Sequence, residues 1–450
     1  MPLTSEQQGL CKRLFNNLNP DKALDPDHPF YEPLYADSET DDPVGHLANS
    51  IRYGGEESLQ LFSGFRGSGK TTELNRLKRD LEAQGYFVLY ANALDYLNPA
   101  EPLEISDILL VLAGSFSDQL ESKGIDIASD SYWQRFTHFL GTTNVQLADF
   151  GMKAGVTGLE ASMKLAFRTT PTFRQRLQEA MQPRLGELRD NVRKFVEDGV
   201  EQIRRKTTDQ QVVFLFDQLE QFRGSLTNEA EMLRSVERVF SAHLSLLRLP
   251  YVHCVFTVPP WLKLIPQGPG APVTVLNCVK LWGKDPARTP FQAGERCLRR
   301  LLQRRFGDGE YLEFFGEPPD PARSGRADRL LSLCGGHFRD LLRLARECVL
   351  RANSLPISDA VITAAIRNVK SSFLPIAVED AKWLHRIGQE RDTILQTTGA
   401  TEVNRLARLL DTHFVLYLRN GDEWYDIHPM IRDEVAEIVA KAESLPKPGA

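Results

Sequence analysis

The stretch LQLFSGFRGSGKTTEL, residues 59–74, decides the fold, because an apolar run, a glycine-rich loop and a helical pattern follow one another there. Residues 59–62 are typical of a buried strand, and Leu74 and Leu77 recur at helical spacing after the loop. Glycines lack a Cβ atom, so successive backbone N–H groups can turn toward one anion, and the helix start adds the positive end of its dipole. The stretch therefore predicts a phosphate-binding loop between a strand and a helix.

The side chains of this loop predict ATP as the ligand and Mg²⁺ as its metal. Lys70 is expected to reach the β- and γ-phosphates as a point charge and to take part in catalysis, and the Thr71 hydroxyl is expected to coordinate Mg²⁺. The predicted ATP-binding residues of the loop are Gly64, Phe65, Arg66, Gly67, Ser68, Gly69, Lys70, Thr71 and Thr72. The alternative, a chance glycine-rich turn, leaves the flanking strand and helix unexplained.

The composition is that of an ordinary soluble globular protein, since 42% of the 450 residues are hydrophobic and 25% are charged. The six cysteines form no CxxC pair, which favours reduced thiols in a cytoplasmic protein over disulfides or zinc sites. The start of the chain lacks a secretion signal, and no apolar stretch approaches the roughly 20 residues of a membrane helix. A net charge of −6 argues against an overall nucleic-acid-binding surface.

Five strand patterns predict an α/β fold with a five-stranded parallel sheet, because helical patterns connect the strands. They begin at residues 59, 86, 211, 251 and 273, and the last is expected to reach residue 282. The continuous apolar run 212–216, which follows Gln211, predicts a buried central strand that ends in Asp217. Ligands of open parallel sheets lie beyond the carboxyl ends of the strands, so Asp217 is expected to hold Mg²⁺ together with Thr71.

The residues that follow Asp217 leave two catalytic interpretations open. Many P-loop ATPases place a second acid directly after the first, whereas this chain has Gln218 there and its next acid is Glu220. Either Glu220 is the base that activates water, or Gln218 positions the water by hydrogen bonds and turnover is slow. Thr257, at the end of a further strand, either senses the γ-phosphate or satisfies nearby backbone groups.

Two segments flank or interrupt the predicted ATPase core, which spans residues 59–290. Residues 1–58 form a lead-in whose aromatic side chains, Tyr31 among them, either stack on the adenine or anchor the segment to the core. Residues 129–206 are predicted to form a helical insertion whose charges are either solvated or contact a partner. Within it, the glycine-rich stretch 151–158 predicts a hairpin or a flap.

A helical lid is predicted for residues 291–376 and a winged-helix-like module for residues 377–450. Gly335-Gly336 separates two lid helices, and Arg339 begins the second. Its guanidinium either lies over the nucleotide phosphates and reports ATP against ADP, or it is an ordinary surface arginine. In the module, Asn420-Gly421 between two alternating runs predicts a β-hairpin, and the acidic residues around it favour a packing or regulatory role over DNA binding.

Together these motifs resemble bacterial ATPases of the STAND and AAA+ branch, the additional-strand class of P-loop proteins, with an origin-recognition-like winged helix. The resemblance rests on GFRGSGKTTEL at 64–74, FLFDQLEQF at 214–222, FTVPPWL at 256–262, GGHFRDLLRL at 335–344 and LYLRNGDEWYDIHP at 416–429. It implies a sheet order of 5-1-4-3-2, a second-sensor role for Arg339, and a winged helix that packs on the ATPase core. The chain departs from the family pattern at Gln218 and Thr257, which puts fast hydrolysis in doubt but not nucleotide binding.

The sequence therefore predicts a conformational-switch ATPase that binds ATP or ADP with Mg²⁺ and couples nucleotide state to a homo-oligomer or protein-partner contact. The resemblance adds that such proteins are often signalling switches, including components of anti-phage defence systems. Two alternatives stay open: a DNA-binding initiator or transposition-type regulator that ATP locks on DNA, and a scaffold whose bound nucleotide is structural. Salt-dependent DNA affinity distinguishes the first, and non-exchanging ADP the second.

Overall fold

The computed structural model describes residues 2–35, 42–125, 135, 138–139, 165–223, 228–265, 268–316, 325–393, 400–420 and 422–444. The chain divides into two compact units. The sheet unit comprises His46–Ser63 and Leu77–Val275, and the glycine-loop unit comprises Met1–Gly45, Gly64–Arg76 and Leu276–Ala450. Among the helices described in these ranges, none is both long and apolar enough to cross a bilayer.

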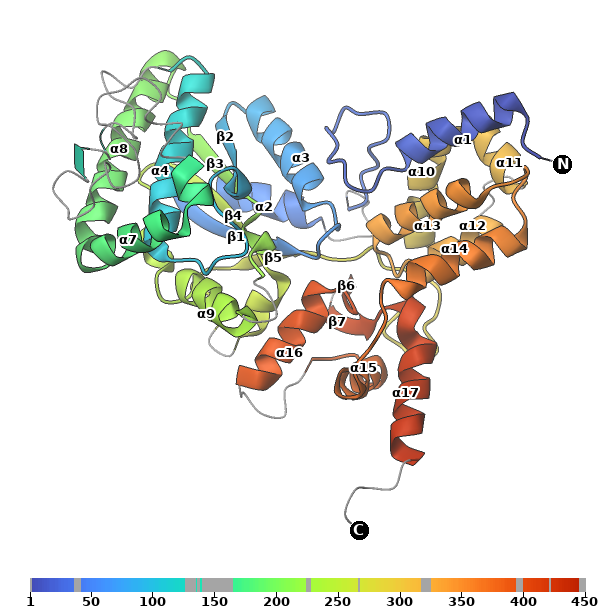
Figure 1. The fold of residues 1–450 in the computed structure, drawn as a ribbon. Coiled ribbons are helices and arrows are strands. Elements are labelled where there is room, and N and C mark those ends of the chain that lie inside the picture. Colours follow the sequence, from blue (N-terminus) through green and yellow to red (C-terminus); the bar gives the residue numbers. More distant parts are fainter. Residues whose placement is uncertain are drawn as a thin grey trace, which may run out of the picture. The chain divides into compact units, whose positions relative to one another are not determined.

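The sheet unit is built on a five-stranded parallel sheet with the strand order β2-β3-β4-β1-β5 (Figure 1). Read from the other edge, this is the expected order 5-1-4-3-2, so the α/β fold class and the topology are confirmed. β3 lies between β2 and β4 and is buried along its whole length, which explains its continuous apolar run. The strands are β1 (Ser58–Gly64), β2 (Phe87–Asn92), β3 (Val212–Asp217), β4 (Val252–Val258) and β5 (Val273–Leu276).

Helices cover this sheet through aromatic packing. α4 lies against β2, and α8 lies against α4 (Figure 1). The Phe116 ring of α4 meets Phe214 of β3 edge-on at 5.9 Å and Phe195 of α8 at 6.3 Å. Gly199 of α8 allows this approach, because a Cβ there would come within 2.6 Å of the Phe116 ring. The helices that accompany the strands are α2 (Pro43–Arg52), α3 (Lys70–Ala83), α4 (Ile105–Ser122), α7 (Pro171–Met181), α8 (Leu185–Lys206) and α9 (Glu229–Phe240).

A buried ion pair fixes α7 to the start of α4. Arg174 donates to Asp107 Oδ2 from Nε at 2.9 Å and from Nη2 at 2.6 Å, and Gln178 donates to the same oxygen at 2.8 Å. α7 and α8 lie within the predicted insertion 129–206, and the glycine-rich stretch 151–158 falls outside the described residues.

The glycine-loop unit is mainly helical. α1 packs on α10 and α13, and the Arg346 guanidinium lies 3.8 Å from the centre of the Phe15 ring. Its helices are α1 (Ser5–Asn17), α10 (Gln292–Phe306), α11 (Asp308–Phe315), α12 (Arg326–Leu333), α13 (Phe338–Arg351), α14 (Asp359–Ser371), α15 (Val378–Glu390), α16 (Ala400–Asp411) and α17 (Arg432–Ser444). Short 3-10 turns across both units are Ala93–Asp95, Gln182–Arg184, Leu219–Gln221, Leu244–Leu247, Pro260–Leu264 and Pro429–Ile431.

A two-stranded hairpin lies among the C-terminal helices. β6 (Val415–Asn420) and β7 (Asp422–Ile427) pair antiparallel, and α15 packs on β7 and on α17. The buried Asp426 of β7 accepts hydrogen bonds from Trp282 at 3.0 Å and from Arg288 at 2.9 Å. The predicted β runs on both sides of Asn420-Gly421 are therefore strands, although Gly421 itself lies outside the described residues.

The last strand of the sheet is shorter than expected. β5 ends at Leu276 instead of continuing to residue 282. The next backbone groups bond elsewhere, since Cys278 N donates to the Tyr417 carbonyl and Val279 N to the Gly336 carbonyl, both at 3.0 Å. An apolar run predicts that a segment is buried but not which element buries it. The sequence-based prediction therefore extended this strand too far.

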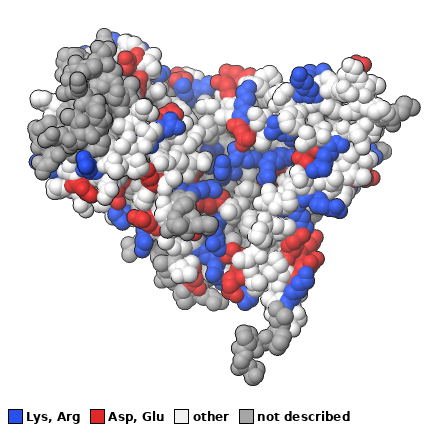
Figure 2. Space-filling view, in the orientation of Figure 1, with Lys and Arg blue, Asp and Glu red and all other residues white. Residues whose placement is uncertain are grey.

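Charges of both signs share the visible face of the molecule, as Figure 2 shows. Lys and Arg side chains lie among Asp and Glu side chains there, in keeping with 54 basic and 60 acidic residues in the sequence. The six cysteines are free thiols in this structure, and five of them are buried.

Candidate functional site

The glycine loop encloses its own lysine. Lys70 is the first residue of α3 and is buried, and its Nζ donates hydrogen bonds to the carbonyl oxygens of Gly64 and Phe65 at 2.8 and 3.0 Å. Gly67 and Gly69 have φ angles of +85° and +87°, a region that L side chains rarely adopt. The loop therefore needs glycine at these two positions, and it surrounds a fixed positive charge.

Two residues at the start of α13 press against this loop. A Cβ added to Gly67 would come within 2.5 Å of Arg339 Cδ, and one added to Gly69 would come within 2.9 Å of Phe338 Cε1. Both glycines thus make room for side chains of the lid helix as well as for the turn. The structure brings Arg339, the predicted sensor, onto the predicted phosphate loop.

His337 adds a polar contact between the same two segments. Its Nε2 lies 2.9 Å from the Arg66 carbonyl oxygen, and its Nδ1 lies 2.8 Å from Asp340 Oδ2 in the first turn of α13. Sequence reasoning missed this residue, because its loop partner is 271 positions away. The sequence did contain one indication of its role. His337 lies between the glycine pair and Arg339, where a helix is predicted to begin.

The glycine pair sets where α13 begins. Gly335 and Gly336 have φ angles of +65° and +78°. A Cβ on Gly335 would come within 2.6 Å of a Leu416 methyl group, and one on Gly336 would come within 1.8 Å of the Val279 carbonyl oxygen. Only glycine fits this close approach, so the turn holds the first residues of α13 at the loop.

Arg339 carries a partly buried positive charge beside the loop. Its side chain is 22% exposed and forms an ion pair with Asp21 at 3.2 Å. Burial lowers the pKa of Arg339, an effect that Asp21 opposes and Arg66 reinforces, yet a guanidinium stays protonated at neutral pH. The charges of Arg339 and Lys70 both suit an anion at this loop.

Two further predicted ATP-binding residues hold the N-terminal segment on α3. The Tyr31 hydroxyl donates to Glu73 Oε1 at 3.2 Å, and the Thr72 hydroxyl accepts from the Leu24 backbone N–H at 3.1 Å. These contacts give Tyr31 and Thr72 an anchoring role. Their contact with nucleotide remains a prediction.

In the sheet unit, Asp217 ends β3 with both carboxylate oxygens engaged. The Tyr90 hydroxyl donates to Oδ2 at 2.7 Å, and the Gln218 backbone N–H donates to Oδ1 at 2.7 Å. Burial raises the pKa of Tyr90 well above its usual range, and the neighbouring Asp217 adds to that rise, so the phenol keeps its proton and stays a donor. Sequence reasoning missed Tyr90, although it lies on the strand that pairs with β3.

The turn after Asp217 positions the two catalytic candidates. Gln218 has a φ of +70°, and Glu220 is buried in the 3-10 turn Leu219–Gln221. The Thr257 hydroxyl accepts from the Leu219 backbone N–H at 3.2 Å, so it supports this turn from β4. The structure thus brings Asp217, Gln218, Glu220 and Thr257 together at one edge of the sheet.

Mg²⁺ ligation by Thr71 and Asp217 remains a prediction, since the two residues belong to different units. Thr71 is the second residue of α3 and is partly exposed. Its hydroxyl and the Asp217 carboxylate are both oxygen ligands of the kind that Mg²⁺ prefers.

No family model matches this chain, and no curated protein matches it. Solved structures that this chain resembles at low similarity include archaeal proteins. They include the Aeropyrum pernix ORC2 protein in its ADPNP-ADP complexes, with 13% identity, 92% of this chain and 98% of that chain covered, and a TM-score of 0.40. The ADP form of the same protein has 12% identity, coverage of 94% and 99%, and a TM-score of 0.39. Cdc6p from Pyrobaculum aerophilum has 12% identity, coverage of 93% and 99%, and a TM-score of 0.31. Scores this low establish neither a family nor an activity for the chain.

Proposed function

We propose that this protein is an ATP–Mg²⁺-binding ATPase that switches conformation with its nucleotide. In this proposal the glycine loop binds the phosphates, Lys70 and Arg339 supply positive charge, and Thr71 and Asp217 hold the metal. Glu220 is the proposed base, with Gln218 as the alternative that only positions water. The conformational change would alter a homo-oligomer or protein-partner contact, of the kind found in signalling and defence switches.

The observation that supports this proposal most directly is the packing of Arg339 against Gly67. A helix that touches the phosphate loop through a guanidinium can respond to the charge of the nucleotide, because charge-assisted bonds to phosphate are strong. The ligand shifts the equilibrium only as far as its affinities for the two conformations differ. A contact that ATP gains and ADP lacks would provide that difference.

Nucleotide binding to the Lys70→Ala variant tests the phosphate assignment. Hydrogen bonds to charged groups contribute about 1.5–3 kcal/mol, so affinity for ATP should fall roughly 10- to 150-fold. Isothermal titration calorimetry measures this fall, and circular dichroism checks that the variant is folded. Wild-type affinity in a folded Lys70→Ala variant would contradict the proposal.

A second experiment asks whether Arg339 distinguishes ATP from ADP. The Arg339→Ala variant should lose more affinity for a non-hydrolysable ATP analogue than for ADP. Arg351→Ala is the matched control, because Arg351 lies at the far end of α13 and pairs with Glu347. Equal losses for both nucleotides would remove Arg339 from the switch while leaving nucleotide binding intact.

A further inference from the structure

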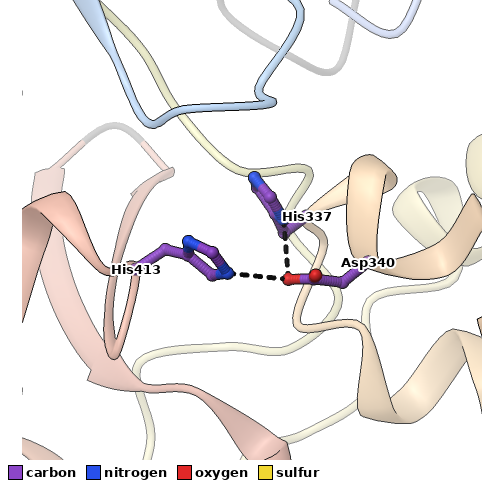
Figure 3. Close-up of side chains that lie close together, drawn as sticks. All are labelled: His337, Asp340 and His413. Atoms are coloured by element: carbon purple, nitrogen blue, oxygen red, sulfur yellow. Dashed lines mark hydrogen bonds and ion pairs between the residues drawn. The ribbon is translucent and has the colours of Figure 1, made fainter. Parts of the chain in front are cut away.

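A buried cluster of imidazoles surrounds one carboxylate oxygen in the glycine-loop unit. His337 precedes α13, Asp340 lies in its first turn, and His413 precedes β6 (Figure 3). Asp340 Oδ2 lies 2.8 Å from His337 Nδ1, 3.2 Å from His413 Nε2 and 3.3 Å from His428 Nε2. His337, Asp340 and His428 have fully buried side chains, and His413 is mostly buried. Residues far apart in the sequence thus meet at a single atom.

With a neutral His337 ring, two acceptor atoms of this cluster face each other. His337 Nε2 faces the Arg66 carbonyl oxygen, which can only accept, so this nitrogen carries the proton of the neutral ring. A lone pair is then left on Nδ1, and it points at Asp340 Oδ2, a second acceptor. His428 is arranged the other way, because its Nδ1 accepts from Met430 N and its Nε2 proton faces Asp340.

Asp340 cannot satisfy all of these neighbours by hydrogen bonding alone. Its Oδ1 already accepts from Arg343 at 3.1 Å, which leaves the two lone pairs of Oδ2 for three imidazole nitrogens. His413 Nε2 points at the carboxylate, 3.2 Å from Asp340 Oδ2 (Figure 3). Potential ligand atoms of His337, His413 and Asp340 therefore converge on one small volume.

We propose that His337 Nδ1, Asp340 Oδ2 and His413 Nε2 bind a divalent first-row metal ion of the Zn²⁺ class. Two imidazole nitrogens and one carboxylate oxygen are a common protein ligand set for zinc, with water in the fourth position. Zinc bonds to such atoms are about 2.0–2.2 Å long. The three ligand atoms lie within 4.8 Å of one another, so small side-chain rotations allow them to share an ion.

The residues behind these ligands have the roles that a metal site requires. A metal-bound histidine usually donates its other ring N–H to a carbonyl or carboxylate, as His337 does to Arg66. Arg343 holds the far oxygen of Asp340 in the same manner. Because Arg66 belongs to the glycine loop, an ion here would fix the ring that connects α13 to that loop.

Metal analysis of the full chain, purified without a polyhistidine tag, tests the site. The protein is stripped with a chelator, dialysed against Zn²⁺ and desalted, and bound zinc is then measured by mass spectrometry. We expect about one Zn²⁺ per chain in the wild type and in the control His385→Ala, whose histidine lies on α15 outside the cluster. His413→Ala should bind at least about tenfold more weakly, since even the loss of an outer-shell partner costs that much.

A spectrum of the wild-type chain with Co²⁺ keeps the test independent of how well the variant folds. Nitrogen and oxygen ligands should produce visible d–d bands without a thiolate charge-transfer band. The proposal is overturned if the wild type retains no zinc, if a thiolate band shows that cysteines bind the metal, or if His413→Ala binds zinc as tightly as the wild type. Each result is independent of nucleotide binding.

Discussion

Replacing Gly336 with alanine tests whether the turn before α13 holds the lid helix at the loop. The new Cβ would lie 1.8 Å from the carbonyl oxygen of Val279 and 2.8 Å from its carbonyl carbon, and backbone atoms cannot rotate away. The Val279 N–H also donates to the Gly336 carbonyl at 3.0 Å, so separating the two segments strains a hydrogen bond. Residues 337–339 should therefore shift with the turn.

Two terms give the size of the effect on stability. The left-handed φ of +78° costs an L residue about 1–2 kcal/mol, and forcing an added carbon into a packed site costs about 1–3 kcal/mol. The free energy of unfolding of the Gly336→Ala variant should therefore be lower than that of the wild type by about 2–5 kcal/mol. A domain of ordinary stability, about 5–15 kcal/mol, survives most of that range, so the variant should remain foldable.

Urea denaturation followed by tryptophan fluorescence measures this loss. Gly85→Ala is the matched control, because Gly85 has a φ of +87° but nothing within 4 Å of its added Cβ. The control should show only the φ term, about 1–2 kcal/mol. If Gly336→Ala destabilises its unit no more than Gly85→Ala does, the close approach to Val279 is not real. If it is destabilised but binds ATP normally, the turn does not support the nucleotide site.

The remaining predictions concern the sheet unit. Arg174→Ala leaves the buried Asp107 carboxylate without its partner and should cost about 3–5 kcal/mol in urea denaturation, with Arg189→Ala on the exposed surface as control. Burial raises the pKa of Asp107, and Arg174 opposes the rise, so removing Arg174 should raise this pKa further. The Arg174→Ala penalty should consequently grow as the pH increases through the raised pKa of Asp107, because the ionised carboxylate is the form that Arg174 stabilises; a penalty independent of pH would contradict this assignment. Glu220→Gln should abolish phosphate release while leaving ATP affinity unchanged; persistent turnover would transfer the water-positioning role to Gln218.

The sheet was predictable because its signals are local. The apolar run that became β3 must be buried on both faces, and a glycine loop after β1 left few topologies for a parallel sheet. The position of Asp217 at the end of that strand followed from the same pattern. Its Tyr90 partner did not, because hydroxyl contacts across strands depend on register, and the continuous apolar run of β3 has no alternation that specifies it.

The lid contact was predictable only in part. A glycine pair followed by a helical pattern indicated where α13 begins, and Arg339 in its first turn suggested a phosphate contact. The pattern could not place Phe338 on Gly69 or His337 on Arg66, since such contacts join segments separated by more than half the chain. Close packing decides them, and a linear pattern of apolar residues does not record which backbone atoms come within contact distance.

The hydrogen bonds of Lys70 determine how the loop can respond to an anion. In this structure the ammonium group already bonds to the Gly64 and Phe65 carbonyls, so a phosphate must compete with two acceptors instead of with bulk water alone. The gain on binding is then the difference between a charge–charge contact and two charge–dipole contacts, which is smaller than the charge–charge contact taken alone. Lys70→Ala removes both sets of contacts, and it should therefore weaken the loop in the nucleotide-free protein as well as its affinity for ATP. Measuring stability and affinity on the same variant separates these two effects.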